Sequence, residues 1–422
     1  MRDSDQLANR LDWGTIVLYL LLVSLGWLNI FAVVYDVQAD QSIFDLSLNS
    51  GKQLVWIATA TLIVTVIMLV DFRFYSSFAY FFYGGIILIL IFVLLFGREV
   101  AGSKSWFTIG SFRMQPSEFA KFATALAVAK YLSTNNRVFY SLKSQLTLFA
   151  IIGLPAILII LQGDTGTAMV YAAFVLVFYR EGFSPLLLGI GIASAILFVL
   201  TLFISQVYLI IAVVVTAFLL IGINSRKTKR IISISVAAVA VISLVVSVDF
   251  LVTDVLQPHQ QNRIKALINP DGDPLGYGWN VTQSKIAIGS GGVWGKGFLQ
   301  GTQTKFDFVP EQSTDFIFCT IGEEHGWMGS ALLIVLFVWL LYRVTIIAER
   351  QKSSFARVYG YSVAAILFFH FAVNIGMTIG LFPVIGIPLP FFSYGGSSLW
   401  AFTVLLFILL KLDAHRLQML TR

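Results

Sequence analysis

The sequence predicts an all-α fold: a polytopic membrane helical bundle with a large structured extracellular loop. Of the 422 residues, 58% are hydrophobic and only 12% are Asp, Glu, Lys or Arg, about half the charged fraction of a typical soluble domain. The charges are also unevenly spread, because residues 13–35, 74–97, 182–225 and 358–410 contain none. An uncharged apolar stretch of about 18 residues or more is long enough to cross a bilayer. These observations exclude a water-soluble globular protein.

Composition excludes other classes as well. Cys319 is the only cysteine, so a disulfide scaffold is excluded, and four scattered histidines do not form the ligand pattern of a Cys/His zinc site. The net charge of +6 requires no nucleic acid, because the anionic lipid of an inner leaflet attracts basic segments. We therefore expect the basic residues to contact anionic membrane lipid.

The spans follow from the apolar stretches in order. The first stretch, 13–35, is too long for a signal-peptide core and lacks a small-residue cleavage site, so it is expected to be an anchor. The 44 uncharged residues 182–225 must hold two spans. The others are expected near 54–70, 78–97, 117–132, 146–162, 166–180, 231–252, 315–342, 358–380 and 396–411. Together they give about twelve transmembrane helices.

Basic residues predict the orientation of these spans. With the N-terminus inside, the inner segments hold 18 of the 28 Lys and Arg residues, and short cytoplasmic loops carry such an excess. We therefore expect a multi-pass protein of the cytoplasmic membrane with both termini in the cytoplasm.

No internal repeat, low-complexity tract or flexible linker is visible, so residues 1–422 are predicted to form a single integral membrane domain. Its largest soluble part is the outer loop 249–315, whose 67 residues hold nine of the 33 glycines. Loops this long are usually functional or disordered, and the Ile, Val, Trp and Phe residues among the glycines of 283–301 argue against disorder.

Within this loop, SGGVWGKG (290–297) has two interpretations. Glycines let backbone N–H groups approach an anion closely, but the spacing is not that of a Walker A loop, because Gly297 rather than Ser or Thr follows Lys296. The alternative is a glycine-rich turn packed on the bilayer surface.

Asp315 stands where this polar loop enters an apolar helix. It is either part of a helix N-cap formed by Ser313, Thr314 or Asp315, or a carboxylate at the water–lipid boundary that can act as a base on a lipid-linked substrate. Glu323 and Glu324 are expected farther along the same helix at membrane depth, where charges face the bundle interior or a cavity. On one helix, Glu323 would lie about 80° around the axis from Asp315.

Other polar residues near the outer ends of spans have a structural and a functional interpretation. Glu118 and Lys121 are three residues apart and can form an ion pair on one helix face. Asp164 lies in a tight outer turn, where capping is the simpler explanation. His370 is expected to be a buried, hydrogen-bonded residue rather than a ligand.

The stretch 380–398 has three prolines and four glycines at expected membrane depth. Non-helical backbone is tolerated there only beside protein or a cavity. The sequence therefore predicts a re-entrant wall of an outward-facing pocket, whose polar groups are Asn374, Ser393, Tyr394, Ser397 and Ser398.

These segments together resemble the SEDS family (shape, elongation, division and sporulation), and within it the RodA group more than the FtsW group. The matching motifs are QPSEFAK, QGDTGTA, DPLGYGWN, QSKIAIGSGGVWGKGFLQGTQ, PEQSTDFIF, GEEHG, NIGM and FPVIGIPLPFFSYGGSS. They run in order through nearly the whole chain. The family usually has ten spans, and the departure is at 182–252, where three are expected here instead of one.

The resemblance implies a peptidoglycan glycosyltransferase that polymerises lipid II at the outer face of the membrane during cell elongation and shape maintenance. It implies a class B penicillin-binding protein as the transpeptidase partner and an essential role for Asp315. It also implies that Glu118 and Lys121 match the family's paired residues in the fourth span.

For such a reaction we expect a single inverting displacement, with Asp315 as the base that deprotonates the acceptor hydroxyl. Cations must stabilise the leaving pyrophosphate, and the candidates on the outer side are Arg113, Lys121, Lys285 and Lys296. Bound Mg²⁺ or Mn²⁺ is chemically reasonable, although no ligand pattern for it is visible. The alternatives are a lipid II flippase, which intramembrane charges and a broken helix would suit, and a non-catalytic scaffold for the penicillin-binding protein.

Overall fold

A computed structural model gives the fold and describes residues 10–35, 42–100, 102–110, 112–135, 141–223, 228–250, 261–262, 277–305 and 308–418. Much of the predicted outer loop 249–315, including residues 273–276 of the DPLGYGWN motif, lies outside the described residues. The predicted domain contains two compact units: Met1–Gly182 together with Asn280–Arg422, and Phe183–Trp279.

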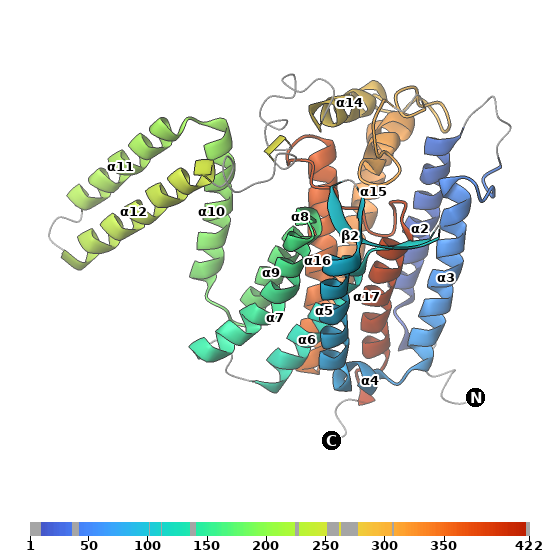
Figure 1. The fold of residues 1–422 in the computed structure, drawn as a ribbon, viewed down its shortest axis with the longest axis horizontal. Coiled ribbons are helices and arrows are strands. Elements are labelled where there is room, and N and C mark those ends of the chain that lie inside the picture. The colour runs from blue at the N-terminus through green and yellow to red at the C-terminus, as the bar shows by residue number, and fades with distance from the viewer. Residues whose placement is uncertain are drawn as a thin grey trace. The chain divides into compact units, whose positions relative to one another are not determined.

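Long helices make up most of the first unit (Figure 1). They are α2 (Trp13–Val34), α3 (Asn49–Leu69), α4 (Phe72–Ser77), α5 (Ala79–Phe96), α6 (Pro116–Thr134), α7 (Leu142–Leu161), α8 (Thr165–Met169), the 3₁₀ helix η2 (Val170–Ala173), α9 (Phe174–Arg180), α15 (Ile317–Glu349), α16 (Ser354–Thr378) and α17 (Gly396–Ala414), with α14 (Tyr277–Ser290) reaching into it. The all-α membrane fold is thus confirmed.

The second unit contains α10 (Pro185–Phe203), α11 (Gln206–Ile223) and α12 (Thr228–Phe250). Helix α12 packs against both α10 and α11. The three helices expected in 182–252 are therefore present. None of the most apolar stretch of α11 is buried, as expected for a helix that faces lipid.

Each of the twelve predicted spans falls on a helix. Within the described part of the chain, nine helices are long and apolar enough to cross a membrane. The span at 117–132 is the more polar α6, 166–180 is divided among α8, η2 and α9, and the first span of 182–225 is α10. The total of twelve transmembrane helices therefore stays a prediction.

The core of the first unit is built around α6, α16 and α17. In α17, 89% of the most apolar stretch is buried, and the helix packs against α3, α6 and α16. Helix α6 presents fully or almost fully buried alanines at 120, 123, 125, 127 and 129. Small residues let helix backbones approach closely in a membrane bundle, so these alanines explain how α6 fits between α5, α16 and α17.

A small antiparallel sheet lies between α5 and α6, and the sequence did not predict it. Its strands are β1 (Arg98–Val100), β2 (Ser103–Ile109) and β3 (Phe112–Met114), in the order β1–β2–β3. Thr108 pairs with Arg113, so Arg113 lies on the last strand, three residues before the start of α6.

The opposite end of the bundle is joined by ion pairs. Arg350, at the end of α15, binds Asp12 at the start of α2 and Asp413 near the end of α17. Arg357 of α16 binds Glu181 after α9 at 2.9 Å. Residues that the sequence predicts to be cytoplasmic therefore gather at the end away from the sheet and α14 (Figure 1).

Candidate active site

Asp315 lies just before α15, at the end of the bundle that carries α14. The helix begins at Ile317, its N-cap is Phe316 and this cap has no side-chain hydrogen bond. The N-cap interpretation of Asp315 is therefore wrong. The Asp315 side chain is half-buried, and its Oδ2 is 3.2 Å from where a Cβ on Gly386 would lie. The carboxylate thus borders the non-helical segment between α16 and α17.

Three consecutive carbonyls hold the backbone around Asp315. The carbonyl of Ser313 accepts a hydrogen bond from the Tyr394 amide at 2.9 Å, and the carbonyl of Thr314 accepts one from Ser393 Oγ at 2.6 Å. The carbonyl of Asp315 accepts one from Asn374 Nδ2 at 2.9 Å. This three-bond clamp fixes the main chain from which the Asp315 carboxylate projects.

The segment 380–395 that supplies two of these donors is non-helical, as the sequence predicted. Gly386 has a φ of +77°, a conformation that residues with a Cβ adopt only at a cost. Ile385 and Ile387 on either side are buried in a cluster with Val373 and Phe369 of α16. The segment is therefore packed against protein, as non-helical backbone at membrane depth requires.

Two serines of this region hold the backbone framework of the site. Ser393 is buried, and its hydroxyl accepts from the Leu389 amide while it donates to the Thr314 carbonyl. Ser397 is also buried and accepts from the amide of Gln115 at 3.1 Å. Both hydroxyls thus support the backbone of the site, and their contact with substrate stays a prediction.

Glu118 and Lys121 form the ion pair that one of the two interpretations predicted. Lys121 Nζ is 2.9 Å from Glu118 Oε2, and both side chains are at most 3% exposed. Lys121 Nζ also lies 2.9 Å from His370 Nε2 and 4.7 Å from the centre of the Phe402 ring. Lys121 is thus fully engaged inside the bundle, and contact of this pair with substrate stays a prediction.

Asp164 caps α8 and connects it to the start of α6. Its Oδ1 accepts from the Thr167 amide at 3.0 Å, and its Oδ2 accepts from Gln115 Nε2 at 2.8 Å and Ser117 Oγ at 3.3 Å. Capping is therefore confirmed. Sequence reasoning missed Gln115, although its place directly before the α6 proline, among other polar residues, was a usable signal.

Glu323 organises the glycine-rich loop. Its carboxylate accepts six hydrogen bonds. They come from Lys296 Nζ, from the backbone amides of residues 302, 303 and 304, and from the hydroxyls of Thr302 and Thr304. Lys296 Nζ lies 2.7 Å from Glu323 Oε1 and also donates to Thr302. Glu323 thus neutralises much of the Lys296 charge, and the role of Lys296 as a cation for the pyrophosphate stays a prediction.

The helix that carries Glu323 and Glu324 is not continuous. Gly326 has a φ of 64° and a ψ of −158° and divides α15 into two helical parts. The residues before the break pack against the loop 291–304, and Asp315 precedes the helix altogether. Glu323 and Glu324 thus lie on the short first part of α15, after Asp315, and their depth in the membrane stays a prediction.

Backbone hydrogen bonds join the glycine-rich loop to the residues on both sides of Gly326 and stabilise the break in α15. The carbonyls of Glu323 and Glu324 accept from the amides of Lys296 and Gly297. After the break, the amides of Trp327 and Met328 donate to the carbonyls of residues 292 and 293. A Cβ on Gly295 would lie 2.1 Å from the Glu324 carbonyl oxygen, so the close approach requires glycine. This explains SGGVWGKG as a packed turn rather than an anion cradle.

Two predicted cations remain exposed at this end of the bundle. Arg113 is exposed on β3, and Lys285 is exposed on α14. The Lys285 ammonium is 3.2 Å from where a Cβ on Gly380 would lie, at the start of the non-helical segment. Ser284 fixes α14 there by donating to the Thr378 carbonyl at 2.9 Å. Lys285 is thus held near the segment that Asp315 borders.

Among the described residues, no group of three or more His, Cys, Asp or Glu side chains is close enough to hold a metal ion. The described residues thus offer no site in which protein side chains alone hold Mg²⁺ or Mn²⁺. Because Mg²⁺ is usually held by one or two carboxylates together with substrate phosphates, a requirement for either ion stays a prediction, and we derive no chemical step through one.

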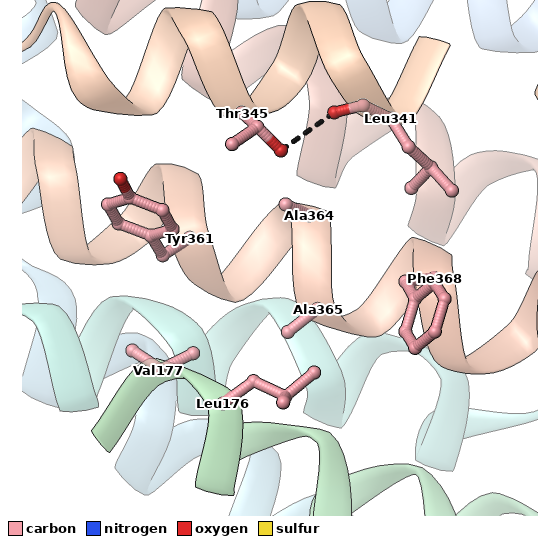
Figure 2. A pocket seen from close by; sticks show the side chains of 8 residues that line it. All are labelled: Leu176, Val177, Leu341, Thr345, Tyr361, Ala364, Ala365 and Phe368. Atoms are coloured by element: carbon pink, nitrogen blue, oxygen red, sulfur yellow. Dashed lines mark hydrogen bonds between the residues drawn. The ribbon is translucent and has the colours of Figure 1, made fainter. Parts of the chain in front are cut away.

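A separate groove of about 230 Å³ lies between α9, α15 and α16. Figure 2 shows its lining, which is apolar except for Thr345 and Tyr361. The Thr345 hydroxyl donates to the Leu341 carbonyl of its own helix at 2.8 Å. This groove can therefore hold an apolar group through van der Waals contacts, but its lining does not form a catalytic site.

Comparison with known proteins agrees with this architecture. The family model FtsW/RodA/SpoVE, described as cell cycle protein, matches residues 12–212 and 181–418. The chain is 32% identical to peptidoglycan glycosyltransferase RodA of Treponema pallidum (96% of this chain, 98% of the relative) and 32% identical to peptidoglycan glycosyltransferase MrdB of Escherichia coli K12 (94% and 93%).

Solved structures share the fold. A chain of a peptidoglycan synthase complex that coordinates polymerization and crosslinking aligns with a TM-score of 0.70 and 25% identity, covering 97% of this chain and 99% of that chain. Rod shape determining protein RodA of Thermus thermophilus aligns with a TM-score of 0.61 and 24% identity, covering 96% and 97%. The two family-model matches overlap at 181–212, within the region where two added helices are expected. The chain belongs to the FtsW/RodA/SpoVE family of cell cycle proteins, which is the SEDS family that its motifs indicate.

Proposed function

We propose that this protein is a peptidoglycan glycosyltransferase that polymerises lipid II into β-1,4 glycan strands at the outer face of the cytoplasmic membrane, during cell elongation and shape maintenance. The names of the full-length relatives support the activity. The observation that carries the mechanism is the half-buried Asp315 carboxylate, which projects from a main chain clamped at three consecutive carbonyls. A fixed carboxylate is what general-base catalysis requires.

The chemistry needs one base and one leaving group. Asp315 takes the proton from the acceptor sugar hydroxyl as its oxygen attacks the anomeric carbon, and the lipid pyrophosphate departs from the opposite side. One displacement inverts the α-linked donor to a β-linked product, so no covalent intermediate is needed. Proton transfer to a positioned base contributes typically about 10²–10⁴-fold.

Arg113 and Lys285 are our candidates to stabilise the charge that develops on the departing pyrophosphate. Both are exposed at the end of the bundle where Asp315 lies, and preorganised cations are effective at such charge. Requirement for Mg²⁺ or Mn²⁺ is tested by adding EDTA and then each cation to purified protein that is polymerising lipid II.

The proposal includes the partner and the orientation. The likeness to a chain of a peptidoglycan synthase complex supports a class B penicillin-binding protein as the transpeptidase partner. The gathering of Arg350, Arg357 and their acidic partners at the end opposite Asp315 supports cytoplasmic termini and an outward-facing site, because basic residues favour the cytoplasmic side.

The decisive experiment gives purified protein lipid II in detergent and separates the products by gel electrophoresis. We expect glycan strands with the unmodified protein and with Glu99→Gln, a control that removes an exposed acid on β1. We expect none with Asp315→Asn. Detergent has no two sides, so a flippase or a scaffold would leave the monomer unchanged, and turnover by Asp315→Asn would remove Asp315 from the role of base.

A further inference from the structure

Two side chains one turn apart on α16 hold the non-helical segment beside Asp315. His370 Nδ1 lies 3.1 Å from the carbonyl oxygen of Pro388, and Asn374 Nδ2 lies 2.8 Å from that of Ile387. Residues four apart share a helix face, so this one face of α16 binds two consecutive carbonyls. The Asn374 amide also reaches the carbonyl of Asp315, which ties the two segments together.

The segment needs such donors because its own backbone supplies few. Pro383, Pro388 and Pro390 have no N–H group. The hydrogen bond at the carbonyl of residue 387 is buried, and that at the carbonyl of residue 388 is partly buried. An unsatisfied buried carbonyl costs about 1–3 kcal/mol. His370 and Asn374 of α16 therefore position these carbonyls through their hydrogen bonds.

The partners of His370 fix its tautomer. Lys121 Nζ can only donate, so His370 Nε2 must accept from it across their 2.9 Å contact. The Pro388 carbonyl can only accept, so Nδ1 must carry the hydrogen. Glu118 in turn holds the Lys121 ammonium at 2.9 Å. The buried Glu118–Lys121 pair thus orients the imidazole so that it donates to Pro388.

We propose that His370 is a positioning residue that couples the buried Glu118–Lys121 pair to Asp315 through the Pro388 carbonyl. The contacts run from α6 to α16 and then to the non-helical segment 380–395. From there, Ser393 and Tyr394 donate to the carbonyls of residues 314 and 313, directly before Asp315. This gives the buried pair a role in turnover without substrate contact. The inference rests on the proposed role of Asp315.

Two isosteric variants separate the bonds that His370 makes. In His370→Asn, the amide nitrogen takes the place of Nδ1 and keeps the bond to Pro388 but loses Lys121. In His370→Gln, the longer side chain reaches Lys121 but loses Pro388. We expect kcat with lipid II to stay close to that of the unmodified protein for His370→Asn and to fall about 10²-fold for His370→Gln, the loss that a misplacement near 1 Å causes.

A merely structural role predicts the opposite order. His370→Asn leaves a buried ammonium without one of its acceptors, so stability should favour His370→Gln. The proposal also expects the KM for lipid II to change little in both variants. If activity follows thermal stability in detergent, or if KM rather than kcat changes, the proposal is wrong.

A double-mutant cycle tests the coupling to the buried pair. Glu118→Gln combined with Lys121→Met removes both charges, and we expect it to lower kcat in the unmodified background because the imidazole loses its orientation. In the His370→Asn background the same change should have no further effect on kcat, because the asparagine amide needs no tautomer. Additive losses in the two backgrounds would contradict the coupling.

Nitrogen NMR of ¹⁵N-histidine gives a readout that needs no activity. The chain has four histidines, so the signal that His370→Gln removes identifies His370. We expect it to report a neutral ring with hydrogen on Nδ1, and a different tautomer would overturn the proposal. If instead Asp315→Asn retained polymerisation, the catalytic role of Asp315 would fail while the NMR result stood, so the two failures are distinguishable.

Discussion

The Lys296 ammonium lies 2.7 Å from the carboxylate of Glu323, whose side chain is completely buried. The same carboxylate also binds the backbone amides of residues 302, 303 and 304. Hydrogen bonds to this one acidic side chain thus hold the backbone of residues 302–304, which form no helix or strand. A carboxylate that accepts several amide hydrogen bonds is a strong local organiser, because such charge-assisted bonds are about twice as strong as neutral ones.

Glu323→Gln should therefore loosen the loop 296–304. A neutral amide cannot accept all six hydrogen bonds, and each bond to a charged group contributes about 1.5–3 kcal/mol. We expect faster hydrogen exchange at the amides of 302–304 and a lower melting temperature in detergent.

The neighbouring Glu324 provides a matched control for that change. It is 1% exposed, and neither of its carboxylate oxygens has a hydrogen bond of good geometry, although the amides of Leu299 and Gly301 lie nearby. Glu324→Gln should leave exchange at 302–304 unchanged. Equal effects of the two substitutions would show that loss of charge, rather than loss of the Glu323 bonds, loosens the loop.

Gly386→Ala should impair turnover more than stability. The φ of +77° costs a residue with a Cβ about 1–2 kcal/mol, and the added methyl group would lie 3.2 Å from Asp315 Oδ2. We expect the methyl group to displace the carboxylate and to lower kcat by at least tenfold, measured with purified protein and lipid II.

Gly102→Ala is the control for backbone strain alone. Gly102 has a similar φ of +81°, but no atom lies within 4 Å of where its Cβ would be. Gly102→Ala should lose as much stability as Gly386→Ala but should retain activity. If Gly102→Ala lost as much activity as Gly386→Ala, contact with Asp315 would not be the cause.

The helices could be predicted from the sequence because each depends on local composition. Apolar stretches of sufficient length identify helices such as α2 and α11 wherever they pack. The re-entrant segment was also predictable, because Pro383, Pro388 and Pro390 prevent a regular helix locally. The sheet of 98–114 was missed because its strands are short and two of them have only three residues.

The connections within the site could not be predicted, because they join residues distant in sequence. Lys121 meets His370 across 249 positions, and Lys296 meets Glu323 across 27. The sequence drew attention to all four residues, but it did not show that Lys121 meets His370 or that Lys296 neutralises Glu323. Lys296 was therefore offered as a ligand for pyrophosphate, although its charge is used by Glu323.

Acid should weaken the connection between α2 and α15. Burial alone would raise the pKa of Asp12, but hydrogen bonds from Arg343 and Thr15 outweigh it and lower that pKa below its ordinary value of 3.8. A lowered folded-state pKa gives stability that is fully present above about pH 4 and is lost as the pH falls through the folded-state value. We expect Asp12→Asn to lower the melting temperature at pH 7, and this difference to shrink below pH 4.

Asp45→Asn is the control for this pH dependence, since Asp45 is exposed and, among the residues that the structure describes, its side chain accepts only from Ser47. It should change the melting temperature little at either pH. A difference between Asp12→Asn and the unmodified protein that persists in acid would mean that the ion pair with Arg343 is not its source.

Lys285 and Lys296 should behave differently although the two lysines lie in the same motif, residues 283–303. Lys285 is exposed and, within the described residues, makes no hydrogen bond or ion pair, so its charge is available to a pyrophosphate. We expect Lys285→Gln to lower kcat/KM for lipid II about tenfold or more, because a hydrogen bond to a charged group contributes about 1.5–3 kcal/mol, and to leave the melting temperature unchanged. Lys296→Gln should lower the melting temperature, since it removes the cation beside Glu323.

Lys104→Gln is the control for surface charge. It removes an exposed outer lysine bound to the Leu95 carbonyl and should change kcat/KM little. A loss with Lys104→Gln equal to that with Lys285→Gln would indicate general attraction of an anionic lipid by surface charge rather than a contact at the leaving group.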